Sequence, residues 1–161
     1  MDTVSDTDLV HLRRCVELAA EAVDAGHQAF GSVLVDAGGV VVAEARNEEG
    51  GGDATRHPEL ELAQLAVRHL APQERPRATV YTSGEHCPMC AAAHAWVGLG
   101  RIVYATSGEQ TARWAAELGA APSPVVSLAI NEVAPGIPTA GPVPELADAV
   151  RELHRRAAGG A

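Results

Sequence analysis

Two segments of the sequence combine a side chain that can bind a metal with a proline and the expected start of a helix. The first is His57-Pro58-Glu59, and the second is Cys87-Pro88-Met89-Cys90. Proline is favoured at the first position of a helix, because its fixed φ suits the helix and its missing N–H would have no partner there. We therefore expect His57 and Cys87 to lie at helix N-termini. The positive end of a helix dipole lowers the pKa of a thiol, and the thiolate is the form that binds a metal.

The spacing of these residues is typical of a catalytic zinc site. Cys87 and Cys90 are separated by two residues, so both sulfurs can reach one tetrahedral ion, and His57 would provide a third ligand. Three protein ligands leave a fourth position for water, whereas structural zinc is normally closed by four protein ligands. Glu59 would stand beside the ion without binding it. A carboxylate there can take a proton from the water and return it to a substrate.

Two other interpretations of the cysteine pair are open at this point. A non-catalytic protein with a structural zinc site would need a fourth ligand, such as His86 or His94, and would give Glu59 no role. A thiol redox protein would use the two cysteines as a dithiol, which leaves the neighbouring histidine and glutamate unexplained. A zinc assay separates these cases, because a dithiol needs no metal and a structural site has no turnover.

The elements that must hold these residues alternate between helices and strands. Apolar residues at intervals of three and four predict a first helix that ends near Gly26, and β-branched runs around a glycine turn predict a hairpin after it. Three successive glycines place residues 48–55 in a loop. A proline-rich extended strap is expected on the surface at 131–144, before a last helix at 145–156. The strands are expected at 32–35, 40–42, 78–82, 102–105 and 125–129, and the other helices at 9–26, 57–71, 88–99 and 111–118.

Strands that alternate with helices predict the α/β class, with right-handed crossovers and later strands that run parallel. The chain of 161 residues and 16.6 kDa has the length of one domain. No internal repeat divides it, and we expect a single domain over residues 1–161 with a C-terminal strap and helix from 131 onward. Its composition, 47% hydrophobic and 20% charged, is typical of a packed globule.

The charge of the sequence bears on its partners and its location. A formal net charge of -9 and a pI near 5.1 would repel a polyphosphate, so nucleic acid is disfavoured and a small molecule is the expected partner. No run of about 18 apolar residues predicts a membrane span, and the acidic start does not resemble a signal peptide. The three cysteines suit a reducing cytoplasmic location, with Cys15 expected to be a buried apolar residue.

Taken in order, the segments at 57–59 and 87–90 resemble the H-x-E and P-C-x-x-C signature of zinc-dependent nucleobase deaminases. The sequence is similar over almost its whole length to the cytidine deaminase-like superfamily of nucleobase and nucleoside deaminases. Residues 29–33 resemble the family's A-F-G-A-V strand, 81–85 its T-S-x-E segment and 101–105 its R-I/V-V-Y-A strand. The helix-then-strand arrangement expected at 111–129 is similar to the branch of guanine deaminases and tRNA adenosine deaminases. This resemblance implies a three-layer α/β/α fold, whose five-stranded mixed sheet has helices on both faces.

The resemblance also implies an activity. A zinc-dependent hydrolase would replace the exocyclic amine of a small nucleobase or nucleoside by a carbonyl and release ammonia. His57, Cys87 and Cys90 would hold Zn²⁺, and Glu59 would move a proton from water to a ring nitrogen. Family members are commonly homodimers, in which residues 131–156 would close the pocket or cross to the second subunit. Editing of tRNA is disfavoured by the net charge, whereas guanine, cytosine, cytidine and other aminoheterocycles stay open.

Four residues are candidate substrate contacts by the same resemblance. Asn47 stands where the family commonly has an asparagine that hydrogen-bonds the base or sugar, and Phe30 where a ring lines the pocket. Glu85 flanks the expected pocket and could bind an exocyclic amine. His86 replaces the family's proline before the first cysteine, so its ring could contact substrate, support a metal ligand, or simply lie exposed or pack. Each of these residues also has an alternative interpretation without contact to substrate. Asn47 could cap the end of a strand, Phe30 could belong to the core, and Glu85 could be a solvated carboxylate.

Overall fold

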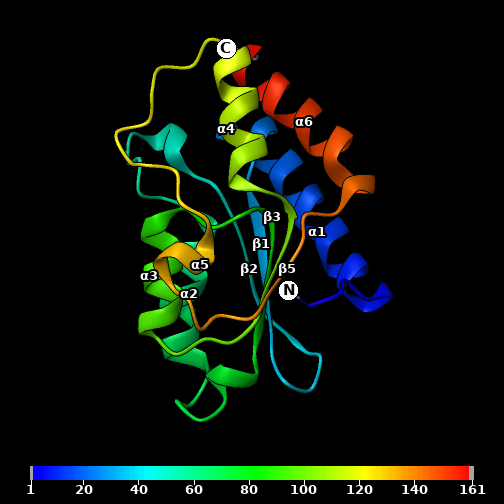
Figure 1. Cartoon of the computed structure of the whole chain (residues 1–161), viewed down its shortest axis with the longest axis vertical. Helices are drawn as coiled ribbons and strands as arrows, with labels where there is room; N and C mark the ends of the chain where they lie inside the picture. The colour runs from blue at the N-terminus through cyan, green and yellow to red at the C-terminus, as the bar shows by residue number, and fades with distance from the viewer. Residues whose placement is uncertain (1, 160–161) are drawn as a thin grey trace.

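The computed structural model describes residues 2–159 and is built around one five-stranded sheet (Figure 1). The strand order is β2-β1-β3-β4-β5. β1 pairs antiparallel with both β2 and β3, whereas β3, β4 and β5 run parallel. The mixed sheet and its parallel later strands therefore confirm the predicted fold class. The strands are β1 (Gly31–Val35), β2 (Val41–Arg46), β3 (Thr79–Gly84), β4 (Ile102–Thr106) and β5 (Thr139–Ala140).

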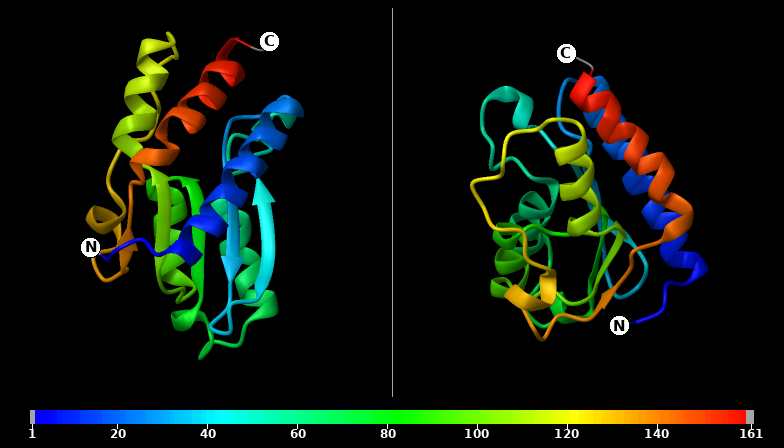
Figure 2. Two further views of the ribbon diagram at one scale, coloured as in Figure 1. Left: turned by 90° about the vertical axis from the view of Figure 1, so that its right-hand side faces the viewer. Right: turned by 45° about the horizontal axis from the view of Figure 1, so that its top comes forward.

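Helices cover both faces of the sheet, as Figures 1 and 2 show. α1 and α6 lie on one face, over an apolar cluster that includes Leu12, Val103 and Val150. α2 lies on the other face, over Leu34 and Val80, with α3 beside it. None of the helices within residues 2–159 has the length and apolarity needed to cross a membrane. The helices are α1 (Asp6–Asp24), η1 (Glu49–Gly51), α2 (Pro58–His69), η2 (Arg75–Arg77), α3 (Pro88–Trp96), α4 (Gly108–Glu117), α5 (Ile130–Val133) and α6 (Pro144–Gly159).

The first helix rests directly on the backbone of β1. A Cβ atom at Gly31 would lie 2.5 Å from the carbonyl oxygen of Cys15 and 2.5 Å from the Cβ of Leu18, so only glycine allows this close approach. Cys15 is fully buried in the same contact, as predicted for a small apolar side chain. The burial of Cys15 and the absence of a side chain at Gly31 thus set the distance between α1 and the sheet.

The prediction of a strand at residues 125–129 is wrong. This segment forms no strand, and Val125 and Val126 are exposed. The fifth strand is instead β5, where Thr139 pairs with Ile102 and Ala140 with Val103. Two residues carry no periodic pattern of their own, so the position of this strand depends on its pairing with β4. The β-branched residues at 125 and 126 line a pocket, described below, and do not pair with the sheet.

The surface strap predicted at 131–144 is also wrong in part. The segment does contain little regular structure, but it includes most of α5 and all of β5, and Thr139, Ala140 and Val143 are buried. Proline is compatible with an edge strand, because the missing N–H can face away from the neighbouring strand. The carbonyl of Pro138 accepts a hydrogen bond from Ile102 N–H at 2.9 Å, which fixes the segment to the sheet edge.

The start of α1 is fixed to the sheet by a buried carboxylate. Asp8 belongs to the capping box of α1, and its Oδ1 accepts hydrogen bonds from Arg101 Nη1 at 2.8 Å and Tyr81 Oη at 2.9 Å. Burial opposes the charge of Asp8, but the hydrogen bonds from Arg101, Ser5 and Tyr81 outweigh it and lower the pKa of Asp8 to about 2. The charged form of Asp8 therefore stabilises the fold.

Replacement of Asp8 by asparagine should lower the free energy of unfolding by about 1–2 kcal/mol at pH 7, after allowance for the partly exposed Arg101. Because the pKa is lower in the folded state, this contribution is present above the unfolded pKa of 3.8 and is lost as the pH falls toward 2. Urea unfolding of both proteins with a metal chelator, at pH 7 and pH 3, measures the difference. An equal difference at the two pH values would contradict the role of the Asp8 charge.

Candidate functional site

The N-termini of α2 and α3 bring three potential metal ligands together. His57 is the N-cap of α2 and Cys87 the N-cap of α3, and each is followed by proline at the first helical position. His57 Nδ1 lies 3.5 Å from Cys87 Sγ and 3.6 Å from Cys90 Sγ. Ligands about 2.0–2.3 Å from a tetrahedral zinc ion lie roughly 3.5 Å from one another, so this arrangement of one imidazole and two sulfurs fits zinc. The structure thus places the three predicted ligands in one group.

Mutual hydrogen bonds prepare the group for a metal. Hydrogen bonds with Cys90 and His57 lower the pKa of Cys87 to about 4, whereas the charge and hydrogen bond of Cys87 raise the pKa of Cys90 above its usual range. Hydrogen bonds with Cys87 and Glu49 raise the pKa of His57 to about 10. One sulfur is therefore a thiolate at neutral pH, and a metal that binds all three residues must displace protons from the group.

Glu59 lies in the first turn of α2 and is 5% exposed. Burial raises the pKa of Glu59 to about 7. A hydrogen bond of 2.8 Å from Thr82 Oγ1 to Glu59 Oε1 acts in the opposite direction and limits this increase. The Thr82 hydroxyl also lies 2.9 Å from Ser32 Oγ, so side chains of β1 and β3 hold the carboxyl group in place. Thr82 can donate a hydrogen bond to the ionised carboxylate or accept one from the protonated form. The surroundings thus suit a group that takes up and releases a proton.

A pocket of about 330 Å³ lies over this group. Residues of α4 and of the segment 123–128, including Val125, Val126 and Leu128, line it together with His57, Glu59 and Cys87. Figure 1 shows this segment, in yellow, running from the end of α4 down to α5. The surface of the pocket is largely apolar, although several polar side chains, among them Glu59, Glu85 and His154, also line it. The size of the pocket and its combination of apolar surface with polar groups are typical of a site for one small molecule.

The four predicted substrate contacts have different positions relative to this pocket. Phe30, Glu85 and His86 line it, whereas the fully buried Asn47 does not. Both carboxylate oxygens of Glu85 accept backbone hydrogen bonds, from Gly108 N at 2.8 Å and from Ile130 N at 3.0 Å. Glu85 therefore connects the starts of α4 and α5 as well as facing the pocket. Contact of these side chains with a substrate stays a prediction.

His86 is buried against a second histidine. Its ring meets that of His94 edge to face, with centroids 5.4 Å apart, and neither ring nitrogen has a hydrogen-bond partner within residues 2–159. Burial lowers the pKa of His86 well below its usual value, so the ring is neutral. His94 Nε2 is 2.7 Å from the carbonyl oxygen of Gly100. Neither histidine belongs to the ligand group, so the fourth protein ligand of a structural zinc site is not found in the described part of the chain.

His154 is a pocket residue that the sequence analysis did not identify. It comes from α6, and its ring lies edge to face with Phe30 at a centroid distance of 5.0 Å and 5.9 Å from Trp114. Burial lowers the pKa of His154 to about 4, so this ring is also neutral. No local motif surrounds His154, and only the packing of α6 against α1 and α4 brings it to the site. The C-terminal helix therefore lines the pocket of its own chain.

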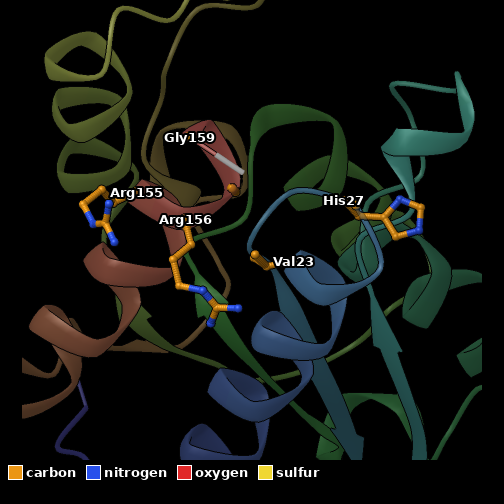
Figure 3. A pocket seen from close by; sticks show the side chains of 7 residues that line it. Val23, His27, Arg155, Arg156 and Gly159 are labelled. Carbon is orange, nitrogen blue, oxygen red and sulfur yellow. The ribbon is translucent and has the colours of Figure 1, made fainter. Parts of the chain in front are cut away.

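A second cavity, of about 460 Å³, lies near the C-terminal ends of α1 and α6 (Figure 3). Its lining includes His27, Arg155 and Arg156, but none of the three metal ligands. Both arginines already have acidic partners, Glu152 for Arg155 and Asp24 for Arg156. His27 Nδ1 accepts a hydrogen bond from Gly50 N at 3.0 Å. Both arginines and His27 Nδ1 thus have partners within the chain.

Comparison with known proteins identifies the family. The model of the cytidine and deoxycytidylate deaminase zinc-binding region matches residues 5–106. A probable cytosine deaminase of Schizosaccharomyces pombe is 32% identical over 119 residues, which cover 74% of this chain and 72% of the relative. The guanine deaminase of Bacillus subtilis is 35% identical over 95 residues, 58% of this chain and 61% of that protein.

The fold is also that of a solved deaminase. The structure of a guanine deaminase from Nitrosomonas europaea superimposes with a TM-score of 0.73 and 20% sequence identity, over 97% of this chain and 86% of that chain. The matched family region contains His57, Glu59, Cys87 and Cys90. His57, Cys87 and Cys90 form the ligand group, and Glu59 lines the pocket beside His57 and Cys87. The chain therefore belongs to the cytidine and deoxycytidylate deaminase family and is a zinc-dependent hydrolase of the deaminase class.

Proposed function

We propose that this chain deaminates an uncharged nucleobase or nucleoside, with guanine-like and cytosine-like rings as the two leading classes. The observation that carries the proposal is a buried carboxylate, Glu59, in the same small pocket as His57 and Cys87. The relatives named for cytosine and for guanine deamination support both ring classes. The two substrates share a planar ring whose amine is attached to an amidine carbon, and the apolar pocket with Phe30 suits such a ring.

The charge of the pocket favours a substrate without phosphate. None of the described residues that line the pocket is an arginine or a lysine, whereas two of them, Glu59 and Glu85, are glutamates. A phosphate group would find no opposite charge there, and it would be buried near carboxylates at a cost in free energy. The net charge of -9 acts in the same direction over longer distances. These facts support a free base or nucleoside over a nucleotide or an RNA.

Each residue of the site has a definite part in the proposed reaction. His57, Cys87 and Cys90 would hold zinc, which when bound supplies a Lewis acid that makes water nucleophilic near neutral pH. Glu59 takes one proton from the attacking water and delivers it to the ring nitrogen beside the amine carbon. The water oxygen forms a bond to that carbon, and the bond to the exocyclic nitrogen breaks. Glu59 then passes the second proton of the water to the departing amine, which leaves as ammonia.

Ammonia release from the zinc-loaded protein tests the substrate class. The panel contains cytosine, cytidine, deoxycytidine, guanine, guanosine and adenine, each nucleoside being paired with its 5′-monophosphate. We expect at least one base or nucleoside to be turned over. A nucleoside that is turned over should have a kcat/KM about tenfold or more above that of its 5′-monophosphate, because burial of an unpaired charge costs more than about 1.4 kcal/mol. A preference for the monophosphates would contradict the proposed substrate class while leaving the deaminase chemistry intact.

This proposal includes a homodimer, which the family resemblance implies, and a cytoplasmic location, which the cysteine content suggests. An exposed aromatic side chain supports the dimer, since Trp96 on α3 is 89% exposed and Val67 on α2 is also exposed. Tryptophan is enriched in protein interfaces. The single domain over residues 1–161 likewise stays a prediction.

A further inference from the structure

A second carboxylate contacts the histidine of the metal group from the side opposite the two sulfurs. Glu49 lies in η1, within the segment that connects β2 to α2. Its Oε1 is 3.0 Å from His57 Nε2, and the two side chains are 25% and 26% exposed. The other ring nitrogen of His57, Nδ1, is the atom that faces Cys87 Sγ and Cys90 Sγ. The imidazole thus bridges a carboxylate and the sulfur pair.

We propose that Glu49 is a positioning residue that orients His57 and selects the nitrogen that it offers to the metal. The inference depends on the proposed metal-dependent function. An ionised carboxylate can only accept hydrogen bonds, so it holds the ring hydrogen on Nε2 and leaves the lone pair of Nδ1 toward the sulfurs when the ring is neutral. A carboxylate in this place also increases the basicity of a ligating imidazole. The hydrogen bond restricts rotation of the His57 ring as well.

Asn47 holds Glu49 in this position. Asn47 Nδ2 donates a hydrogen bond to Glu49 Oε1 at 2.8 Å, and Asn47 Oδ1 accepts one from the backbone N–H of Glu49 at 2.9 Å. The backbone N–H of Asn47 donates to the carbonyl of Phe30 at 3.0 Å, and Oδ1 also lies 3.3 Å from Gln28 N. A continuous series of hydrogen bonds therefore leads from the start of β1 through Asn47 and Glu49 to His57.

This arrangement gives Asn47 a part in holding Glu49, in addition to the predicted contact with substrate. Its side-chain oxygen already accepts two backbone hydrogen bonds, and its side-chain nitrogen donates to Glu49. Asn47 is fully buried and is absent from the lining of the pocket. An asparagine side chain can donate and accept hydrogen bonds at the same time, so the carboxamide of Asn47 can hold both the side chain and the backbone of Glu49.

Zinc affinity tests the proposal, because it reports on the ligand group independently of turnover. The variants are Glu49→Ala, which removes the carboxylate, and Glu49→Gln, which keeps an acceptor oxygen but removes the charge. The matched control is Glu48→Gln, since the neighbouring Glu48 pairs with Arg56 and does not contact His57. Competition with a chromogenic chelator gives the zinc dissociation constant, and circular dichroism verifies folding. A cobalt-substituted sample reports the ligand geometry through its absorption spectrum.

We expect Glu49→Ala to weaken zinc binding by about 10- to 100-fold, Glu49→Gln to weaken it less, and Glu48→Gln to leave it unchanged. Asn47→Ala should weaken zinc binding in the same direction as Glu49→Ala. Unchanged zinc affinity in a folded Glu49→Ala protein, or in Glu49→Gln if the alanine variant does not fold, would overturn the proposal. An Asn47→Ala protein that binds zinc normally and shows only a raised KM would instead assign Asn47 to the substrate. Failure of the unmodified protein to bind zinc would overturn the proposed function itself.

Discussion

Replacement of Glu59 by glutamine should reduce kcat by about 10²–10⁴-fold while the protein keeps its zinc. Glutamine has nearly the same shape and can still hydrogen-bond Thr82 Oγ1, which lies 2.8 Å from the carboxylate, so the fold should not change. The amide cannot accept a proton from water or deliver one to the ring nitrogen. Ammonia release, measured beside the zinc content of the same sample, gives both quantities.

The matched control is Glu61→Gln, in the same turn of α2. Glu61 does not line the pocket, so its amide variant should retain turnover. The Glu59→Gln protein should also be slightly more stable than the unmodified protein, because the substitution removes a carboxylate charge that is buried away from water. Normal turnover by a zinc-loaded Glu59→Gln protein would show that the proton is carried by another group.

The helix starts of the site were predictable because each depends on a few neighbouring residues. Proline at positions 58 and 88 fixes the first turn of α2 and of α3. The fixed turns then place His57 and Cys87 at N-caps and Cys90 one turn later. Such local chemistry does not depend on how distant parts of the chain pack. The ligand group was therefore predictable from spacing, although its approach to 3.5 Å was not.

The residues that the sequence analysis did not find depend on tertiary packing. Glu49 belongs to a glycine-rich segment that we predicted to be a loop, and nothing local indicates that it turns back to His57. His154 reaches Phe30 only because α6 packs beside α1 and α4. β5 is likewise defined by its partner strand, since two residues have no periodicity. Each of these features requires contacts between segments that lie far apart in the sequence.

Removal of one metal ligand should abolish both zinc binding and turnover. We expect Cys90→Ala to retain no zinc after dialysis against a chelator, because the remaining His57 and Cys87 offer two ligand atoms in place of three. The ammonia-release rate should then fall to background. Stability should fall as well, since a ligand present at 100 times its dissociation constant stabilises the folded state by about 2.7 kcal/mol. Metal analysis and thermal unfolding with and without added zinc measure these effects.

Cys15→Ala is the matched control, because it also replaces a cysteine by alanine. Cys15 is fully buried between α1 and β1, outside the ligand group, so its alanine variant should bind one zinc ion and keep its activity despite some loss of stability. Burial raises the pKa of the Cys15 thiol well above its usual value, which also makes it a poor metal ligand. Zinc should therefore raise the unfolding temperature of Cys15→Ala and have no such effect on Cys90→Ala. If zinc stabilised both variants equally, the metal would have to bind somewhere other than between the N-termini of α2 and α3.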